Sequence, residues 1–206
     1  MTDFGLYVII SHPLLPYRTI VETCVEEGIR IIQLREKHLS DREIIDLGRD
    51  IQKIIRGTAT SLIINDRPDL AAIIGADGYH LGQEDLPIEL STRFYPDASI
   101  RGLSTHNLQQ VEVALQEAPD YIGFGPVYPT PTKEKPDPTV GTELLQKAVT
   151  MSSIPVVAIG GINEKNIEAV LKAGARNIAL VRYFMQHNNL RERIKTILET
   201  CKHYWR

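Results

Sequence analysis

The chain has 206 residues, of which 43% are hydrophobic, so it is long and apolar enough for one well-buried core and is not an intrinsically disordered protein. Its formal net charge of -3 gives no electrostatic reason to expect a nucleic-acid partner, and no apolar run approaches the length of a membrane span. The N-terminus lacks the pattern of a secretion signal, and Cys24 and Cys201 match no metal or redox spacing, so we expect a cytoplasmic protein with reduced thiols.

Short apolar runs alternate with amphipathic segments along the whole chain. The first half predicts, in order, strand Leu6–Ile10, helix Tyr17–Glu27, strand Ile29–Leu34, a helix from Ser40 to Ile55, strand Ser61–Ile64, helix Pro68–Ile74, strand Gly78–Leu81 and helix Pro87–Phe94. The second half predicts strand Ser99–Leu103, helix Leu108–Glu117, strand Tyr121–Phe124, helix Thr142–Met151, strand Pro155–Ile159, helix Asn163–Ala173, strand Ile178–Val181 and helix Leu190–Tyr204. Most of the strands are continuously apolar, which is typical of parallel strands covered on both faces.

This alternation predicts an α/β fold, either an open doubly-wound sheet or a closed (β/α)8 barrel. The count of eight strands favours the barrel, and no glycine-rich dinucleotide fingerprint follows the first strand. Three similar helix-to-strand joints, at Gly75–Tyr79, Ala118–Ile122 and Gly174–Ile178, indicate repeated βα units. We therefore predict one TIM-barrel catalytic domain over residues 1–206.

The active site of such a barrel lies at the carboxyl ends of its strands. Polar and charged residues concentrate there: Gln33, Arg35, Lys37, Asn65, Asp66, Gln83, Glu84, Asp85, Ser104, Thr105, His106, Gly160, Gly161 and Arg182. The opposite joints carry mostly Gly, Ala and Asp. This asymmetry predicts a ligand site at the carboxyl-end rim.

Several of these groups suit phosphate. Arg35 and Lys37 place two cations within three residues, as a phosphate site would need. Taken alone, the pair is interpreted more simply as part of a solvated surface turn. The long segment after Phe124 contains Thr130, Thr132 and Lys133, whose hydroxyls and charge suit phosphate oxygens. The alternative interpretation of this segment is a proline-rich surface loop. Gly160 and Gly161 let backbone N–H groups approach an anion, and also suit a tight strand-to-helix turn.

Asp66 and Asp85 follow adjacent predicted strands, with Asn65 and Gln83 beside them. Either carboxylate alone reads equally well as a turn residue before Pro68 or Pro87. Together they suit Mg²⁺, which takes one or two carboxylates plus substrate phosphate oxygens. Cations and a metal on one rim imply a diphosphate substrate, and the glycine pair implies a second, monophosphate substrate.

Six blocks, Gln33–Lys37, Asn65–Asp66, His80–Asp85, Gly102–His106, Gly125–Lys133 and Ala158–Gly161, resemble those of the thiamine phosphate synthase family, in that family's order. The resemblance implies a TIM-barrel transferase that joins 4-amino-2-methyl-5-hydroxymethylpyrimidine diphosphate to a thiazole phosphate and releases pyrophosphate. It implies Mg²⁺ as the cofactor, and departure of pyrophosphate before the thiazole nitrogen captures the pyrimidine cation.

The same resemblance implies the residue roles. The pyrimidine diphosphate is held by Gln33, Leu34, Arg35, Glu36, Lys37, Asn65, Ser104 and Lys133, of which Arg35, Lys37, Ser104 and Lys133 are catalytic. Magnesium is held by Asp66 and Asp85. The thiazole phosphate is held by Thr130, Pro131, Thr132, Gly161, Val181 and Arg182.

One position departs from the family pattern, because Arg182 stands where the family usually carries Ser. We favour an additional phosphate contact by its guanidinium over an ion pair that narrows the site.

Two alternatives remain: the related thiazole tautomerase, with His106 as proton carrier, and a barrel that binds phosphate ligands without turnover. We expect small-molecule substrates, with no nucleic acid or membrane partner. The oligomeric state stays open, since Cys201–Arg206 suits either a second copy in a homo-oligomer or the barrel's own helices.

Overall fold

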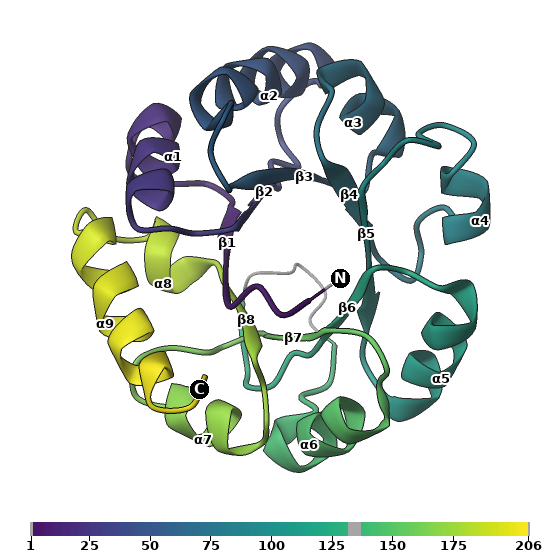
Figure 1. The fold of residues 1–206 in the computed structure, drawn as a ribbon, viewed down its shortest axis with the longest axis vertical. Coiled ribbons are helices and arrows are strands. Elements are labelled where there is room, and N and C mark those ends of the chain that lie inside the picture. Colours follow the sequence, from purple (N-terminus) through teal and green to yellow (C-terminus); the bar gives the residue numbers. More distant parts are fainter. Residues whose placement is uncertain (1, 132–136, 206) are drawn as a thin grey trace.

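Eight parallel strands form a closed barrel in the computed structural model, which describes residues 2–131 and 137–205 (Figure 1). The strands are β1 Leu6–Ile10, β2 Ile31–Leu34, β3 Ser61–Asn65, β4 Gly78–Leu81, β5 Ile100–Thr105, β6 Tyr121–Phe124, β7 Val156–Ile159 and β8 Asn177–Leu180. Each strand pairs with the next in the chain, and β1 closes the barrel by pairing with β8. The predicted TIM barrel is confirmed.

The helices surround the barrel as an outer ring (Figure 1). They are α1 Tyr17–Glu26, α2 Asp41–Ile55, α3 Pro68–Ile74, α4 Ile88–Ser91, α5 Leu108–Glu117, α6 Gly141–Met151, α7 Ile167–Lys172, α8 Arg182–Met185 and α9 Leu190–Lys202. Their apolar stripes pack on the outer face of the strands, which explains why the strands are apolar on both faces. None of the helices in the described part of the chain is long and apolar enough to cross a membrane.

The start of α2 shows how the sequence defines a boundary. Ser40 Oγ accepts a hydrogen bond from the Glu43 backbone N–H, and the Glu43 carboxylate accepts one from the Ser40 N–H at 2.8 Å. This reciprocal capping box satisfies two donors that the first helical turn would otherwise leave unpaired. The predicted helix start is confirmed.

The predicted helix at Asn163 starts four residues later, at Ile167. The Asn163 Oδ1 accepts from the Lys165 N–H at 2.9 Å, and the Asn166 Oδ1 accepts from the Asn163 N–H at 2.8 Å. Asparagine side chains compete in this way with helical hydrogen bonds, so these residues form turns instead of the first helical turn. The short helix α8, directly after β8, was not predicted.

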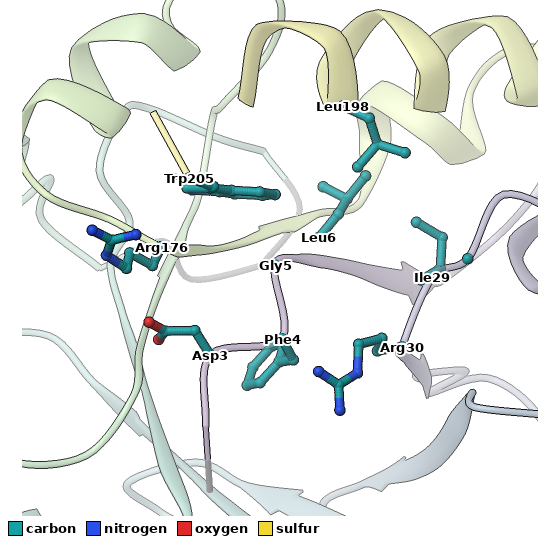
Figure 2. Close-up of a pocket in the computed structure, with 10 residues that line it drawn as sticks. Asp3, Phe4, Gly5, Leu6, Ile29, Arg30, Arg176, Leu198 and Trp205 are labelled. Atoms are coloured by element: carbon teal, nitrogen blue, oxygen red, sulfur yellow. The ribbon is translucent and has the colours of Figure 1, made fainter. Parts of the chain in front are cut away.

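The amino-terminal end of the barrel is closed by the chain's own termini. The buried Asn177 Oδ1 accepts from the backbone N–H groups of Phe4 and Gly5, at 2.8 and 3.2 Å. Trp205 lies over Gly5 and donates its Nε1–H to the Ala175 carbonyl at 3.2 Å (Figure 2). The C-terminal segment therefore packs on this same barrel.

A pocket of about 320 Å³ lies at this end. In Figure 2, Arg30 and Arg176 lie on opposite sides of Phe4. The pocket lies at the amino ends of the strands and is separate from the carboxyl-end rim where the sequence places the active site.

Candidate active site

Lys37, Asp66 and Asp85 lie together at the carboxyl-end rim. Lys37 Nζ is 2.9 Å from Asp66 Oδ2, which joins the segment after β2 to the end of β3. Asp66 has φ 62°, a left-handed conformation that is uncommon for a residue other than glycine. Its N–H donates to the His80 carbonyl at 2.8 Å, so the backbone of β4 holds this carboxylate in place.

Asp85 completes the acidic pair. Its Oδ2 accepts a hydrogen bond from the Gly82 N–H at 2.6 Å, which folds the loop after β4 back over the rim. Burial raises the pKa of the Asp85 carboxyl, and the adjacent Asp66 carboxyl raises it further. Two carboxylates that disfavour each other's charge, beside one lysine, form an oxygen donor set that fits a hard divalent cation such as Mg²⁺.

A chain of hydrogen bonds crosses the barrel interior and ends at two predicted substrate-binding residues. Gln33 Nε2 donates to the Tyr7 hydroxyl at 2.8 Å, and the hydroxyls of Tyr7 and Tyr121 are 2.9 Å apart. The Tyr121 hydroxyl is 2.9 Å from His80 Nδ1, and His80 Nε2 is 2.8 Å from Ser104 Oγ. This polar chain (Gln33, Tyr7, Tyr121, His80 and Ser104) holds the Gln33 and Ser104 side chains in fixed orientations.

Gly102 makes room for the polar chain. A Cβ at this position would lie 2.2 Å from the Tyr121 ring and 2.4 Å from His80 Nδ1. Burial raises the pKa of the Tyr7 and Tyr121 hydroxyls, so both remain protonated and able to donate at neutral pH. The two tyrosines are therefore uncharged members of an ordered hydrogen-bond network.

The rim beyond β7 is shaped by two glycines. Gly160 has φ 100° and Gly161 has φ 65°. A Cβ on Gly160 would lie 2.5 Å from Pro126, and one on Gly161 would lie 2.7 Å from the Pro129 carbonyl oxygen. Only glycine satisfies both the backbone angle and the close approach of the segment after β6.

The predicted thiazole-phosphate residues that the structure describes belong to the segments after β6, β7 and β8. Thr130 and Pro131 follow the segment that contacts Gly161, and the Tyr128 N–H donates to the Gly160 carbonyl at 3.0 Å. Val181 and Arg182 follow β8, which pairs with β7 through Ile159 and Ala179. Arg182 is exposed and makes no ion pair with a residue in the described ranges. Thr132 and Lys133 lie outside the described residues.

Comparison with known proteins shows the family to which the chain belongs. The family model described as thiamine monophosphate synthase matches residues 6–184. The chain belongs to this family. Thiamine-phosphate synthase from Dictyoglomus thermophilum is 44% identical over 185 residues, which cover 90% of this chain and 83% of that protein. The synthase from Persephonella marina is 41% identical, with 96% and 97% covered.

Solved structures show the same family likeness. Thiamine phosphate pyrophosphorylase from Pyrococcus furiosus is 34% identical, with a TM-score of 0.89 over 98% of this chain and 97% of that one. A 3-hexulose-6-phosphate synthase shares only 15% identity at a TM-score of 0.71, so its likeness shows the fold alone.

Within the thiamine monophosphate synthase family's Gln33–Lys37 block, the side chains alternate in direction. Gln33 bonds to Tyr7 inside the barrel, and Lys37 reaches Asp66 on the rim. Leu34 is buried in the cluster between strands and helices, and the Glu36 carboxylate accepts hydrogen bonds from the loop after β1. Leu34 and Glu36 would therefore contact a substrate at the rim through their backbone.

Two further predicted residues border this region. Asn65 is the half-buried last residue of β3 and pairs in register with His80. Arg35 follows β2, and its N–H donates to the Ile10 carbonyl at 2.9 Å, which extends the strand ladder by one step. Both positions stay predictions as substrate contacts.

Sequence reasoning assigned no individual role to Tyr7, Tyr121 or His80. The available signal was the presence of two hydroxyl groups in otherwise apolar runs, since buried tyrosines usually need a hydrogen-bond partner. His106, the proton carrier in the tautomerase alternative, lies before α5. Its Nδ1 donates to the Gly125 carbonyl at 2.6 Å, so the ring links the ends of β5 and β6.

Proposed function

We propose that this chain catalyses the formation of thiamine phosphate from 4-amino-2-methyl-5-hydroxymethylpyrimidine diphosphate and a thiazole phosphate, with release of pyrophosphate. The observation that carries the proposal is the contact of Lys37 with Asp66, beside Asp85, at the carboxyl-end rim of a barrel whose interior holds Gln33 and Ser104 in the polar chain. Family membership supports the same reaction, and the enzyme is a transferase.

The diphosphate is bound on the β2–β4 side of the rim. Asp66 and Asp85 would hold Mg²⁺, which neutralises charge on the departing pyrophosphate when it is bound. Lys37 lies within reach of any anion beside Asp66, because its Nζ is already 2.9 Å from that carboxylate. Arg35 and Lys133 add further cations in this proposal, and together these groups stabilise the leaving group electrostatically.

The pyrimidine ring is bound by uncharged groups. Gln33, Asn65 and Ser104 offer amide and hydroxyl groups, and the polar chain fixes two of them. The aminopyrimidine itself stabilises the cation that remains when the C–O bond to pyrophosphate breaks. The thiazole nitrogen then donates its electron pair to form the C–N bond. The enzyme's role is therefore to orient two reactants and exclude competing water.

The thiazole phosphate is bound opposite, near β7 and β8. Gly161 leaves its N–H groups accessible because no side chain covers them, and Thr130 contributes a hydroxyl from the neighbouring loop. Arg182 supplies a guanidinium that suits phosphate oxygens. Arg182→Ser, the usual family residue, should raise the KM for thiazole phosphate and leave the KM for the pyrimidine diphosphate unchanged. Equal KM values for thiazole phosphate in both proteins would remove Arg182 from the site.

We further propose a cytoplasmic enzyme that acts on small molecules alone. Cys24 and Cys201 are both buried and unpaired, and burial raises the pKa of each thiol to about 12. Such thiols are unreactive, in keeping with a structural role in a reducing compartment.

The test is a reaction with both substrates and Mg²⁺, in which pyrophosphate and thiamine phosphate are measured together. The proposal predicts equimolar products, and Lys133→Ala should lower turnover by about 10²–10³. Conversion of the thiazole alone, without pyrophosphate, would indicate the tautomerase instead. Binding without any product would indicate a non-catalytic barrel.

A further inference from the structure

The segment that follows β2 carries a second group of side chains, which contacts the loop that follows β1. Lys37 contacts Asp66, whereas Glu36 and His38 face the loop between β1 and α1, where His12 lies. The proposed reaction gives these three side chains no role. They form a cluster, which we call the outer triad: His12, Glu36 and His38.

The ligand atoms of the outer triad converge on one point. His12 Nδ1 lies 3.8 Å from Glu36 Oε2, and His38 Nδ1 lies 3.5 Å from the same oxygen. One ligand atom from each of the three residues lies within 4.8 Å of the others. The two imidazole rings stack with centroids 4.3 Å apart, so both present Nδ1 to the same side.

Glu36 is held rigidly as the base of the cluster. Its side chain has 0% exposure, and its Oε1 accepts hydrogen bonds from the His12 N–H at 2.8 Å and the Tyr17 hydroxyl at 3.0 Å. Among the described residues, Oε2 accepts one longer hydrogen bond, from the same His12 N–H, at 3.1 Å. This oxygen therefore keeps a lone pair directed toward the two imidazoles.

The histidines, in contrast, are accessible. Their side chains are 62% and 50% exposed, so an ion from solvent can reach the cluster and the rings can adjust. His12 has φ 47°, and its strained backbone is fixed by the Glu36 carboxylate. Glu36 is therefore a buried and fixed ligand, whereas His12 and His38 are solvent-exposed ligands.

We propose that the outer triad is a binding site for a divalent transition metal, of which Zn²⁺ is the best match, through Nδ1 of His12, Nδ1 of His38 and Oε2 of Glu36. Two imidazoles and one carboxylate form a ligand set that zinc favours, with a fourth position left for water. Metal–ligand bonds of about 2.0–2.2 Å in a tetrahedron place neighbouring ligand atoms about 3.3 Å apart. The two nitrogen–oxygen separations, 3.8 and 3.5 Å, are close to this spacing, and all three ligand atoms lie within 4.8 Å of one another.

This site differs from the proposed magnesium site in its residues and in its chemistry. Asp66 and Asp85 offer oxygen alone, which suits Mg²⁺, whereas imidazole nitrogen suits zinc and its neighbours in the transition series. A bound metal would join the β1–α1 loop to the segment after β2. That segment carries Arg35 and Lys37, so the metal would also restrain two predicted substrate-binding cations.

The test is a calorimetric titration of the whole chain with ZnCl₂ in excess Mg²⁺, which keeps the carboxylate pair occupied. The proposal predicts one zinc per chain for the wild type and for His187→Asn, a matched control at an exposed histidine outside the triad. His38→Asn and His12→Asn should each weaken zinc binding by at least about tenfold, since even outer-shell changes cost about 10–100-fold. Circular dichroism would verify that each variant is folded.

A titration with Co²⁺ supplies a second readout, because cobalt held by two imidazoles and a carboxylate gives a visible absorption that oxygen-only coordination does not match. The band should appear with the wild type and disappear with His38→Asn. Absence of saturable zinc binding by the wild type, or equal affinities in His38→Asn and His187→Asn, would overturn the proposal. Neither outcome affects pyrophosphate release, which tests the proposed reaction separately.

Discussion

Replacing Tyr121 with Phe removes one hydroxyl from the polar chain and keeps the buried ring. The hydroxyl contacts the Tyr7 hydroxyl and His80 Nδ1, both at 2.9 Å. Because buried hydrogen bonds contribute about 0.5–1.5 kcal/mol each, losing two should lower the free energy of unfolding by about 1–3 kcal/mol. Loss of the Tyr121 contact also frees the His80 ring that orients Ser104, so kcat/KM should fall by about 10–100-fold.

Tyr79→Phe is the matched control. Tyr79 is equally buried, but its hydroxyl contacts Ser91 Oγ at 2.9 Å, on the helix side of the barrel. This variant should lose about 0.5–1.5 kcal/mol of stability and retain its turnover. Urea denaturation and steady-state assays of both variants test the reasoning. If Tyr121→Phe kept wild-type kcat/KM, or if Tyr79→Phe lost as much activity, the polar chain would have no role in orienting substrate.

Three further predictions concern the rim and the scaffold. Burial and Asp66 raise the pKa of Asp85, so the ionised Asp85 carboxyl destabilises the metal-free fold above that pKa, and its protonation weakens Mg²⁺ binding as the pH falls. Asp85→Asn should therefore raise the melting temperature in chelator at neutral pH and reduce the pH dependence of Mg²⁺ affinity. Unchanged melting would contradict this. Gly161→Ala places a side chain at φ 65°, which should lower the free energy of unfolding by about 1–2 kcal/mol in chemical denaturation. It should also raise the KM for thiazole phosphate, and a wild-type KM would argue against a phosphate site there. Ser40→Ala removes the cap of α2 and should lower the free energy of unfolding by about 0.5–2 kcal/mol without altering kcat. A loss of turnover in this variant would contradict a purely structural role of the cap.

Local pattern was sufficient for the scaffold. The predicted bounds of β1, β4 and β6 match the structure, and β1 is a compact apolar run closed by glycine and polar residues. Helix α2 was recognisable from Ser40 and Glu43, whose contact spans only three positions. Such features depend on neighbours in sequence and need no knowledge of the fold.

Contacts across the barrel could not be predicted in the same way. Tyr7 and Tyr121 meet only because β1 and β6 face each other through the interior, and that depends on barrel closure and register. The sequence indicated that Asp66 and Asp85 share a rim, but the ion pair of Asp66 with Lys37 required the structure. Helix α8 has four residues, too few to show helical periodicity.

Calorimetric titration with 4-amino-2-methyl-5-hydroxymethylpyrimidine diphosphate, in the presence and absence of Mg²⁺, tests the central claim about the carboxyl-end rim most directly. We predict that the wild type binds this diphosphate tightly only with Mg²⁺, and that Asp66→Asn and Asp85→Asn lose the magnesium-dependent part. Equal affinity with and without Mg²⁺, or binding that both variants retain, would contradict the account.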